Sequence, residues 1–222
     1  MTFFVSIQNT HHSIEIAIFN DEHLLSFIRE NKIRASKTLI PLIAFSLLRA
    51  NIRPDELSFI AVNQGPGPFT TLRVIIATAN GLSFATKLPL IGIDALDALL
   101  QEYSSDDDPY TIVLLNAFNN DVYFAIQQQA HAPLQKGYKN IDLLLQELHL
   151  MIPKNRSVRF LGNGVTLHEK AIRKVFGTRT YIPEPLPTAC SIKQIGIMGL
   201  QKWRNKESLS EQLMPLYLKT AL

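Results

Sequence analysis

The sequence predicts an α/β protein whose sheets mix parallel and antiparallel strands. Three short apolar strands joined by polar turns open the chain, as in an antiparallel meander. Strands then alternate with helices up to about residue 102, the order that builds a layered α/β domain. The 222 residues are 46% hydrophobic and 18% charged, which is typical of a globular protein with one large or two small domains.

Residues 1–104 are expected to form an N-terminal lobe. Its predicted strands are Phe3–Ile7, Ile14–Ile18, Leu24–Phe27, Phe59–Val62 and Leu88–Ile93. Its predicted helices are Ser36–Ala50, Thr70–Ala85 and Ala95–Glu102. Ser36 is the expected N-cap of the first helix, and Pro41 lies deep enough to distort the helix start.

Residues 105–204 are expected to form a C-terminal lobe, after a charged linker at Ser104–Asp108. Its predicted strands are Ile112–Leu115, Val122–Ile126 and Val158–Gly162, and its predicted helices are Ile141–Leu150, His168–Val175 and Ser191–Trp203. Residues 205–222 are placed as a segment that packs back on the first lobe.

Two helices of the first lobe have almost no polar face. Apolar residues cover most of the circumference of Leu39–Leu48, and no charged residue lies between Arg73 and Lys87. A surface helix normally has a polar side, so we expect packing on both sides, against the sheet and against a partner. The expected interface residues are Leu39, Ile40, Ile43, Leu47, Leu72, Ile75, Ala79 and Leu82. The alternative is that Leu213–Leu218 folds back and covers the patch.

The turn Gly65-Pro66-Gly67-Pro68 precedes the second of these helices. A helix N-terminus attracts anions, so Gly65, Gly67, Thr70 and Arg73 are candidate contacts for an anion or nucleotide. The alternative is a rigid turn with Thr70 or Thr71 as the helix cap, because the two prolines offer no N–H group.

The remaining candidates for chemistry favour structural interpretations. His11 and His12 are adjacent and diverge, so no metal site is expected. Cys190 is the only cysteine and is expected in the core. Residues 1–134 carry a net charge of −5, and residues 135–222 carry a net charge of +8. The basic half could face RNA phosphates, or it could be a basic surface without a ligand. No signal peptide or membrane span is recognised, which predicts a cytoplasmic protein.

The stretch from Gly65 to Arg73, with Pro89–Leu99 after it, resembles the TsaB (YeaZ) family pattern G-P-G-S-F-T-G-L-R and P-L-x-G-(V/I)-x-x-L-x-A-L. Pro68 and Thr71 depart from it. The resemblance reaches weakly through most of the chain, to Pro215–Lys219. It implies the two-lobed fold of actin, sugar kinases and Hsp70.

The resemblance also implies a subunit without its own active site that holds and activates TsaD, together with TsaE. That machinery forms N6-threonylcarbamoyladenosine at adenosine 37 of tRNA. ATP and Mg²⁺ would belong to the complex, with no cofactor of this chain's own, and tRNA would be met through the complex. Gln8, Asn116 and Phe118 replace family residues that are charged, which leaves their roles open.

Two other functions compete with this interpretation. One is a small-molecule kinase or ATPase of the same fold, which the uncharged Gln8 at the end of the first strand disfavours because Mg²⁺ prefers carboxylate ligands. The other is a homodimeric binding protein that uses the same two helices.

Overall fold

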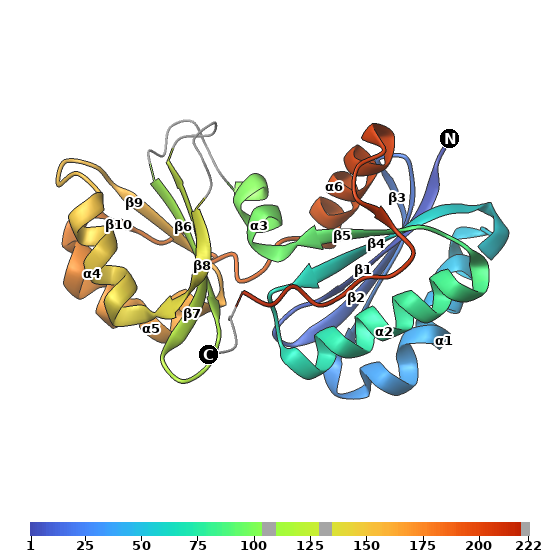
Figure 1. Ribbon diagram of the computed structural model, residues 1–222, viewed down its shortest axis with the longest axis horizontal. Helices are drawn as coiled ribbons and strands as arrows, with labels where there is room; N and C mark the ends of the chain where they lie inside the picture. Colours follow the sequence, from blue (N-terminus) through green and yellow to red (C-terminus); the bar gives the residue numbers. More distant parts are fainter. Residues whose placement is uncertain (104–109, 129–134, 219–222) are drawn as a thin grey trace. The chain divides into compact units, whose positions relative to one another are not determined.

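A computed structural model describes residues 1–103, 110–128 and 135–218. The chain divides into two compact units (Figure 1). Unit 1 contains Met1–Ala98 and Ser191–Leu216, and unit 2 contains Leu99–Cys190 and the residues that follow Leu216. The expected linker Ser104–Asp108 lies outside the described residues.

Unit 1 is built on a six-stranded mixed sheet. Its strands, in spatial order, are β11 (Leu209–Ser210), β5 (Leu90–Asp94), β4 (Leu57–Gly65), β1 (Phe3–Asn9), β2 (Ser13–Asn20) and β3 (His23–Asn31). The first three strands of the chain form the predicted antiparallel meander, and β1, β4 and β5 run parallel.

Helices cover both faces of this sheet (Figure 1). The helices α1 (Ala35–Ala50) and α2 (Phe69–Thr86) lie side by side on one face, and α6 (Ile192–Asn205) lies on the other. Successive side chains of β1 pack on opposite faces of the sheet. Val5 packs under α1 and α2, and Phe4 stacks between Phe19 and Phe59 on the other face. Trp203 of α6 extends this aromatic stack from Phe59.

The position of α6 differs from the expected division, which assigned residues 191–204 to the second lobe. Two glycines explain how this helix approaches the sheet of unit 1. A Cβ at Gly196 would lie 2.8 Å from the ring of Phe19, and one at Gly199 would lie 2.7 Å from the Cβ of Ala61. The missing side chains therefore bring the backbone of α6 into direct contact with the sheet.

The start of α1 also differs from expectation. A 3-10 turn, Lys32–Arg34, precedes the helix, and Arg34 occupies the N-cap position without a side-chain hydrogen bond. Ser36 lies inside the first turn and is exposed. Pro41 is accommodated within the helix.

Unit 2 is built on a five-stranded sheet. Its strands, in spatial order, are β10 (Thr180–Tyr181), β9 (Val158–Leu161), β6 (Tyr110–Asn116), β7 (Asp121–Gln128) and β8 (Gln135–Asn140). The helices α4 (Ile141–Met151) and α5 (Asn163–Phe176) pack on it around one apolar core, and α3 (Ala95–Tyr103) leads into the unit. The expected helix at His168–Val175 starts five residues earlier, at Asn163.

The segment Leu209–Leu216, which we call the C-terminal strap, returns to unit 1. It pairs with β5 as the edge strand β11, and Leu213 then enters the core formed with α1 and α2. The carboxamide of Asn80 accepts from the Leu213 N–H at 2.9 Å and donates to its carbonyl at 3.0 Å. Within the described residues, no helix has the length and apolar character needed to cross a membrane.

Candidate functional site

Most of the side chains predicted for an interface on α1 and α2 point into unit 1. The six buried members belong to its hydrophobic core: Leu39, Ile43, Leu47, Leu72, Ile75 and Ala79. Leu82 is half-buried against the same core, and Ile40 is 59% exposed. The expectation that Ile75 or Ala79 lies on an accessible face is wrong, because both are fully buried.

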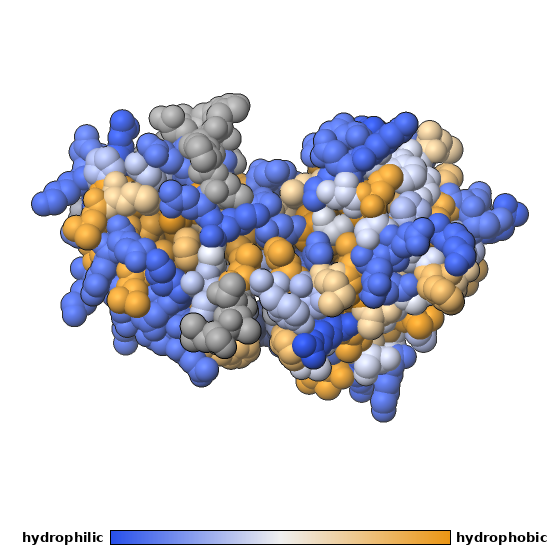
Figure 2. All heavy atoms as spheres, in the orientation of Figure 1, coloured by the Kyte–Doolittle hydropathy of each residue, from blue (hydrophilic) through white to orange (hydrophobic). Residues whose placement is uncertain are grey.

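The outer side of the two helices carries a different set of apolar residues. Leu48 is 76% exposed, and Phe45 and Phe84 are exposed as well. The exposed positions of α2 also include the small residues Ala77, Gly81 and Ala85. Figure 2 shows hydrophobic side chains at the surface in the region of α1 and α2.

An apolar groove of about 370 Å³ lies between α1 and α2. Ile40, Ala44 and Leu48 border it from α1, and Leu82 and Thr86 border it from α2. The groove and its exposed borders form what we call the helix face. Its physical character is that of a docking surface for apolar side chains.

The two helices that flank the groove carry charge of one sign. The ranges 35–50 and 69–87 contain Lys37, Arg49, Arg73 and Lys87 and no Asp or Glu. Three of these cations lie over aromatic rings close to them in sequence: Arg49 over Phe45, Arg73 over Phe69 at 3.8 Å from the ring centroid, and Lys87 over Phe84 at 4.7 Å.

The C-terminal strap covers a different side of α2. Asn80 and Ser83 hold it through the hydrogen bonds of Asn80 with Leu213 and through a 3.3 Å bond from Ser83 Oγ to the Glu211 carbonyl. The groove between α1 and α2 has no strap residue in its lining. The C-terminal segment therefore folds back and buries Leu213, which is 6% exposed, but it does not cover the helix face.

The Gly65–Pro68 turn is filled by the chain itself. Gly65 has a φ of +104°, and a Cβ there would lie 2.8 Å from Leu72 and 3.6 Å from the Leu216 carbonyl oxygen. A carbonyl oxygen beside the turn is unfavourable for an anion. Pro68 is the N-cap of α2 and lacks a side-chain hydrogen bond, so neither Thr70 nor Thr71 takes the expected capping position.

The remaining two candidate anion contacts, Thr70 and Arg73, lie in the first turns of α2 and are exposed. Because Arg73 lies over the ring of Phe69, its guanidinium already has an aromatic contact. The structure thus places the four candidate residues along one turn without building a polar cavity from them.

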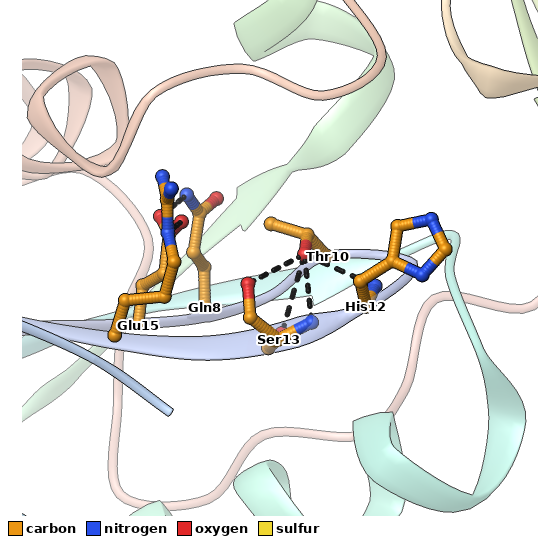
Figure 3. A network of polar contacts seen from close by, with 6 residues as sticks. Gln8, Thr10, His12, Ser13 and Glu15 are labelled. Atoms are coloured by element: carbon orange, nitrogen blue, oxygen red, sulfur yellow. Dashed lines mark hydrogen bonds and ion pairs between the residues drawn. The ribbon is translucent and has the colours of Figure 1, made fainter. Parts of the chain in front are cut away.

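The end of the first strand carries a closed polar network (Figure 3). Buried Gln8 donates from Nε2 to Glu15 Oε2 at 2.6 Å, and Arg29 Nε donates to Glu15 Oε1 at 2.7 Å. Both carboxylate oxygens of Glu15 are therefore bonded to side chains of this chain. The end of this strand therefore presents an uncharged amide whose carboxylate partner is already paired.

The adjacent turn is ordered by hydroxyl groups. Thr10 Oγ1 accepts from the Ser13 N–H at 3.0 Å, and the two hydroxyls lie 2.9 Å apart (Figure 3). The rings of His11 and His12 meet edge to face at 4.8 Å between centroids. Among the described residues, no group of three His, Cys, Asp or Glu side chains is placed to hold a metal ion.

The departures at Asn116 and Phe118 shape one tight turn in unit 2. Asn116 Oδ1 accepts from the Phe118 N–H at 2.9 Å, and its own N–H donates to Asn163 Oδ1 at 3.0 Å. Phe118, Asn119 and Asn120 are three successive residues in the left-handed region, and the Phe118 ring is exposed. Asn116 therefore stabilises the turn through hydrogen bonds and brings no charge to it.

Comparisons with known proteins agree with this geometry. The model of the family described as "TsaD: tRNA N6-adenosine threonylcarbamoyltransferase" matches residues 30–221. The tRNA threonylcarbamoyladenosine biosynthesis protein TsaB of Bacillus subtilis (strain 168) is 23% identical, over 98% of this chain and 94% of that protein. The TsaB protein of Escherichia coli (strain K12) is 21% identical, over 65% of this chain and 63% of that one.

Solved structures show the same fold. YeaZ from Pseudomonas aeruginosa has a TM-score of 0.73 at 20% identity, covering 98% of this chain and all of that one. A Bacteroides thetaiotaomicron protein with an actin-like ATPase fold and unknown function has a TM-score of 0.51 at 10% identity, over 89% of this chain and 95% of that one.

The fold and the family model define an actin-like α/β protein built on the domain of a tRNA threonylcarbamoyltransferase. Within this class, the chain belongs to the TsaB (YeaZ) family. The fold class and the family that the sequence predicted are both confirmed.

Proposed function

We propose that this chain is a non-catalytic subunit for the formation of N6-threonylcarbamoyladenosine in tRNA, and that it binds a TsaD-type catalytic subunit through the helix face. The family membership supports the pathway. The observation that carries the binding role is the open apolar groove between α1 and α2, flanked by exposed Leu48 and Ile40. Binding there would favour the active conformation of the partner. TsaE and ATP enter this proposal only at the level of the complex, in the cytoplasm.

The polar network at the end of β1 supports a role without catalysis. A metal-dependent phosphoryl transfer needs carboxylate or other oxygen ligands aimed at the ion. Gln8 offers no charge, and Glu15 is 3% exposed with both its oxygens bonded to Gln8 and Arg29. Opening this network for a metal would leave the Arg29 guanidinium without its carboxylate.

The charge of α1 and α2, which flank the helix face, favours a different chain over a second copy of this one. A two-fold homodimer places the same surface against itself, so Lys37, Arg49 and Lys87 would approach cations of the second copy. Like charges across an interface oppose association, whereas a partner surface with carboxylates around an apolar centre would be attracted. We therefore propose a TsaD-type partner whose docking surface is acidic at its rim.

The test is complex formation between this chain and the TsaD of its own organism, measured by size-exclusion chromatography with light scattering. Wild type should form a mixed complex at micromolar concentration. Leu48→Glu and Ala85→Glu should abolish it, because each would bring a desolvated carboxylate to the apolar groove or its rim. Both positions are exposed, so the variants should unfold at the wild-type denaturant concentration.

The matched control is Leu150→Glu, because Leu150 is 85% exposed on α4 of unit 2. This control introduces the same charge and removes an exposed leucine away from the helix face. Equal binding by wild type, Leu48→Glu and Ala85→Glu would show that the helix face is not the contact. Absence of any mixed complex, with TsaE and ATP also present, would remove the proposed function.

A further inference from the structure

The charge of unit 2 is strongly polarised along its sequence. Residues 99–148 contain 2 Lys and Arg against 7 Asp and Glu, whereas residues 149–181 contain 7 against 1. The two stretches carry balances of −5 and +6. The basic half of the chain described above is thus concentrated in one segment, which runs from the end of α4 to β10.

The fold brings three parts of this segment together at one junction of unit 2. Arg179 donates to the Pro153 carbonyl at 3.2 Å, lies 3.3 Å from His149 Nδ1, and has its guanidinium 5.0 Å from the Phe176 ring centroid. These contacts join the last turn of α4, the loop before β9 and the end of α5. Lys154 and Arg156 belong to that loop before β9, and Lys174 belongs to the last turn of α5, two residues before Phe176. We call Lys154, Arg156, Lys174 and Arg179 the basic end.

The cations of the basic end are available to a ligand. Lys154, Arg156 and Lys174 are exposed, and within the described part of the chain none of the three has a carboxylate within 4 Å. The single acidic residue of the segment, Glu169, is paired with Arg173 at 2.7 Å. Cations in the last turn of a helix interact favourably with its carbonyl groups, and this interaction explains why a lysine stands at position 174. That effect does not account for Lys154 and Arg156 in the loop.

From this geometry we propose that the basic end binds the phosphate backbone of the tRNA substrate directly. The proposal rests on the proposed function and extends it, because the chain would then hold the substrate as well as the catalytic partner. Polyanionic RNA gains affinity from several cations on one surface through release of its counterions. Protein interfaces, by contrast, are depleted of lysine at their centres.

The contacts expected here are to phosphate and sugar groups, without recognition of base sequence. Lys154 and Arg156 lie two residues apart on an exposed loop, and no carboxylate among the described residues pairs with either, so both can follow an RNA backbone. Lys174 and Arg179 add two more cations to the basic end, and Arg179 is held by its hydrogen bond to the Pro153 carbonyl. The basic end would therefore position the tRNA rather than select it.

The experiment titrates a fluorescent tRNA transcript carrying adenosine 37 with the full chain, alone and in complex with TsaD, at several salt concentrations. Lys154→Glu/Arg156→Glu is the test variant. Its matched control is Lys193→Glu/Lys206→Glu, which makes the same change of charge at two exposed positions of α6 and its cap. The variant Lys154→Arg/Arg156→Lys keeps the charge and should bind as wild type does.

The test variant should bind tRNA roughly tenfold more weakly at 100 mM salt. The slope of the logarithm of its binding constant against the logarithm of the salt concentration should fall in magnitude by about two. The control should change little, and both variants should still bind TsaD. Equal affinities and slopes for the test variant and the control would overturn the proposal. So would a test variant that loses TsaD and keeps tRNA, since the basic end would then be a protein contact.

The two proposals fail in different ways. Wild type that forms no complex with TsaD, but loses tRNA affinity on reversal of Lys154 and Arg156, would remove the proposed function and support the RNA site. A normal TsaD complex in which the chain's tRNA affinity is independent of these residues would do the opposite.

Discussion

Asn80 fastens the C-terminal strap to α2, so Asn80→Ala should destabilise unit 1. Its carboxamide makes two hydrogen bonds with the backbone of Leu213, at 2.9 and 3.0 Å. Each is worth about 0.5–1.5 kcal/mol net, and the alanine would leave a backbone N–H and a carbonyl without their partner. We therefore expect a loss of about 1–3 kcal/mol in the free energy of unfolding.

The assay is urea unfolding followed by tryptophan fluorescence. The chain has one tryptophan, Trp203, which stacks on Phe59 at 5.1 Å and therefore reports on unit 1. With a denaturant slope of about 2 kcal/mol per molar, the expected loss lowers the urea midpoint by about 0.5–1.5 M. Hydrogen exchange at the Leu213 amide should rise at the same time, because the strap opens locally.

Asn80→Asp separates the two hydrogen bonds. The carboxylate still accepts from the Leu213 N–H, but it cannot donate and it meets the Leu213 carbonyl oxygen. This variant should be at least as destabilised as Asn80→Ala. If Asn80→Ala unfolds within about 0.5 kcal/mol of wild type and the exchange at Leu213 is unchanged, the strap is not held by these bonds.

Three further outcomes follow from burial, space and charge. Ile75→Glu places a carboxylate in the core and should cost more than about 4 kcal/mol, giving an unfolded circular dichroism spectrum instead of a selective loss of binding. Gly81→Ala should raise the unfolding free energy by about 0.5–1 kcal/mol, since no atom lies within 4 Å of the new Cβ in this helical position. Burial, then Lys32 and His12, lower the pKa of His11 below the ordinary 6.5, so the unfolded chain binds the proton more tightly. Stability should fall as the pH drops below about 6.5, and His11→Asn should reduce that fall in urea midpoints compared between about pH 5 and 7.5.

The apolar helices illustrate what the sequence predicts and where it stops. The existence of α1 and α2 follows from their residues, as does the need for cover on two sides. Which side faces the sheet does not follow, because apolar residues surround both helices and no polar stripe marks the outside. For this reason Ile75 and Ala79 were predicted on the outer face, although they are core residues.

Elements that depend on distant partners were also beyond the sequence. The strand β8 has the polar sequence Gln135–Asn140, and it forms because β7 offers an edge to pair with. The helix α6 has an ordinary amphipathic pattern, and this pattern does not indicate which of the two sheets the helix covers. The glycines at 196 and 199 were the available signal, since they permit close approach to a sheet.

The basic end shows the same limit for the site. The sequence shows that the second half of the chain is basic. Only the fold brings His149, Pro153 and Arg179 together at one junction. At the end of the first strand, the sequence shows only that Gln8 is uncharged. The commitment of Glu15 to Gln8 and Arg29 could not be foreseen, because it depends on the pairing of β2 with β1 and β3.

The split composition of unit 1 has a consequence for synthesis on the ribosome. Residues 1–98 emerge first, yet the aromatic face of their sheet stays uncovered until α6 follows, up to Asn205. Almost all of unit 2, Leu99–Cys190, lies in between, so it can fold before unit 1 is complete. At synthesis rates of about 5–20 residues per second, the 107 residues from Leu99 to Asn205 (205 minus 98) take roughly 5–21 s. During that interval Phe4, Phe19 and Phe59 form an exposed aromatic surface, which makes the nascent chain a candidate client for chaperones.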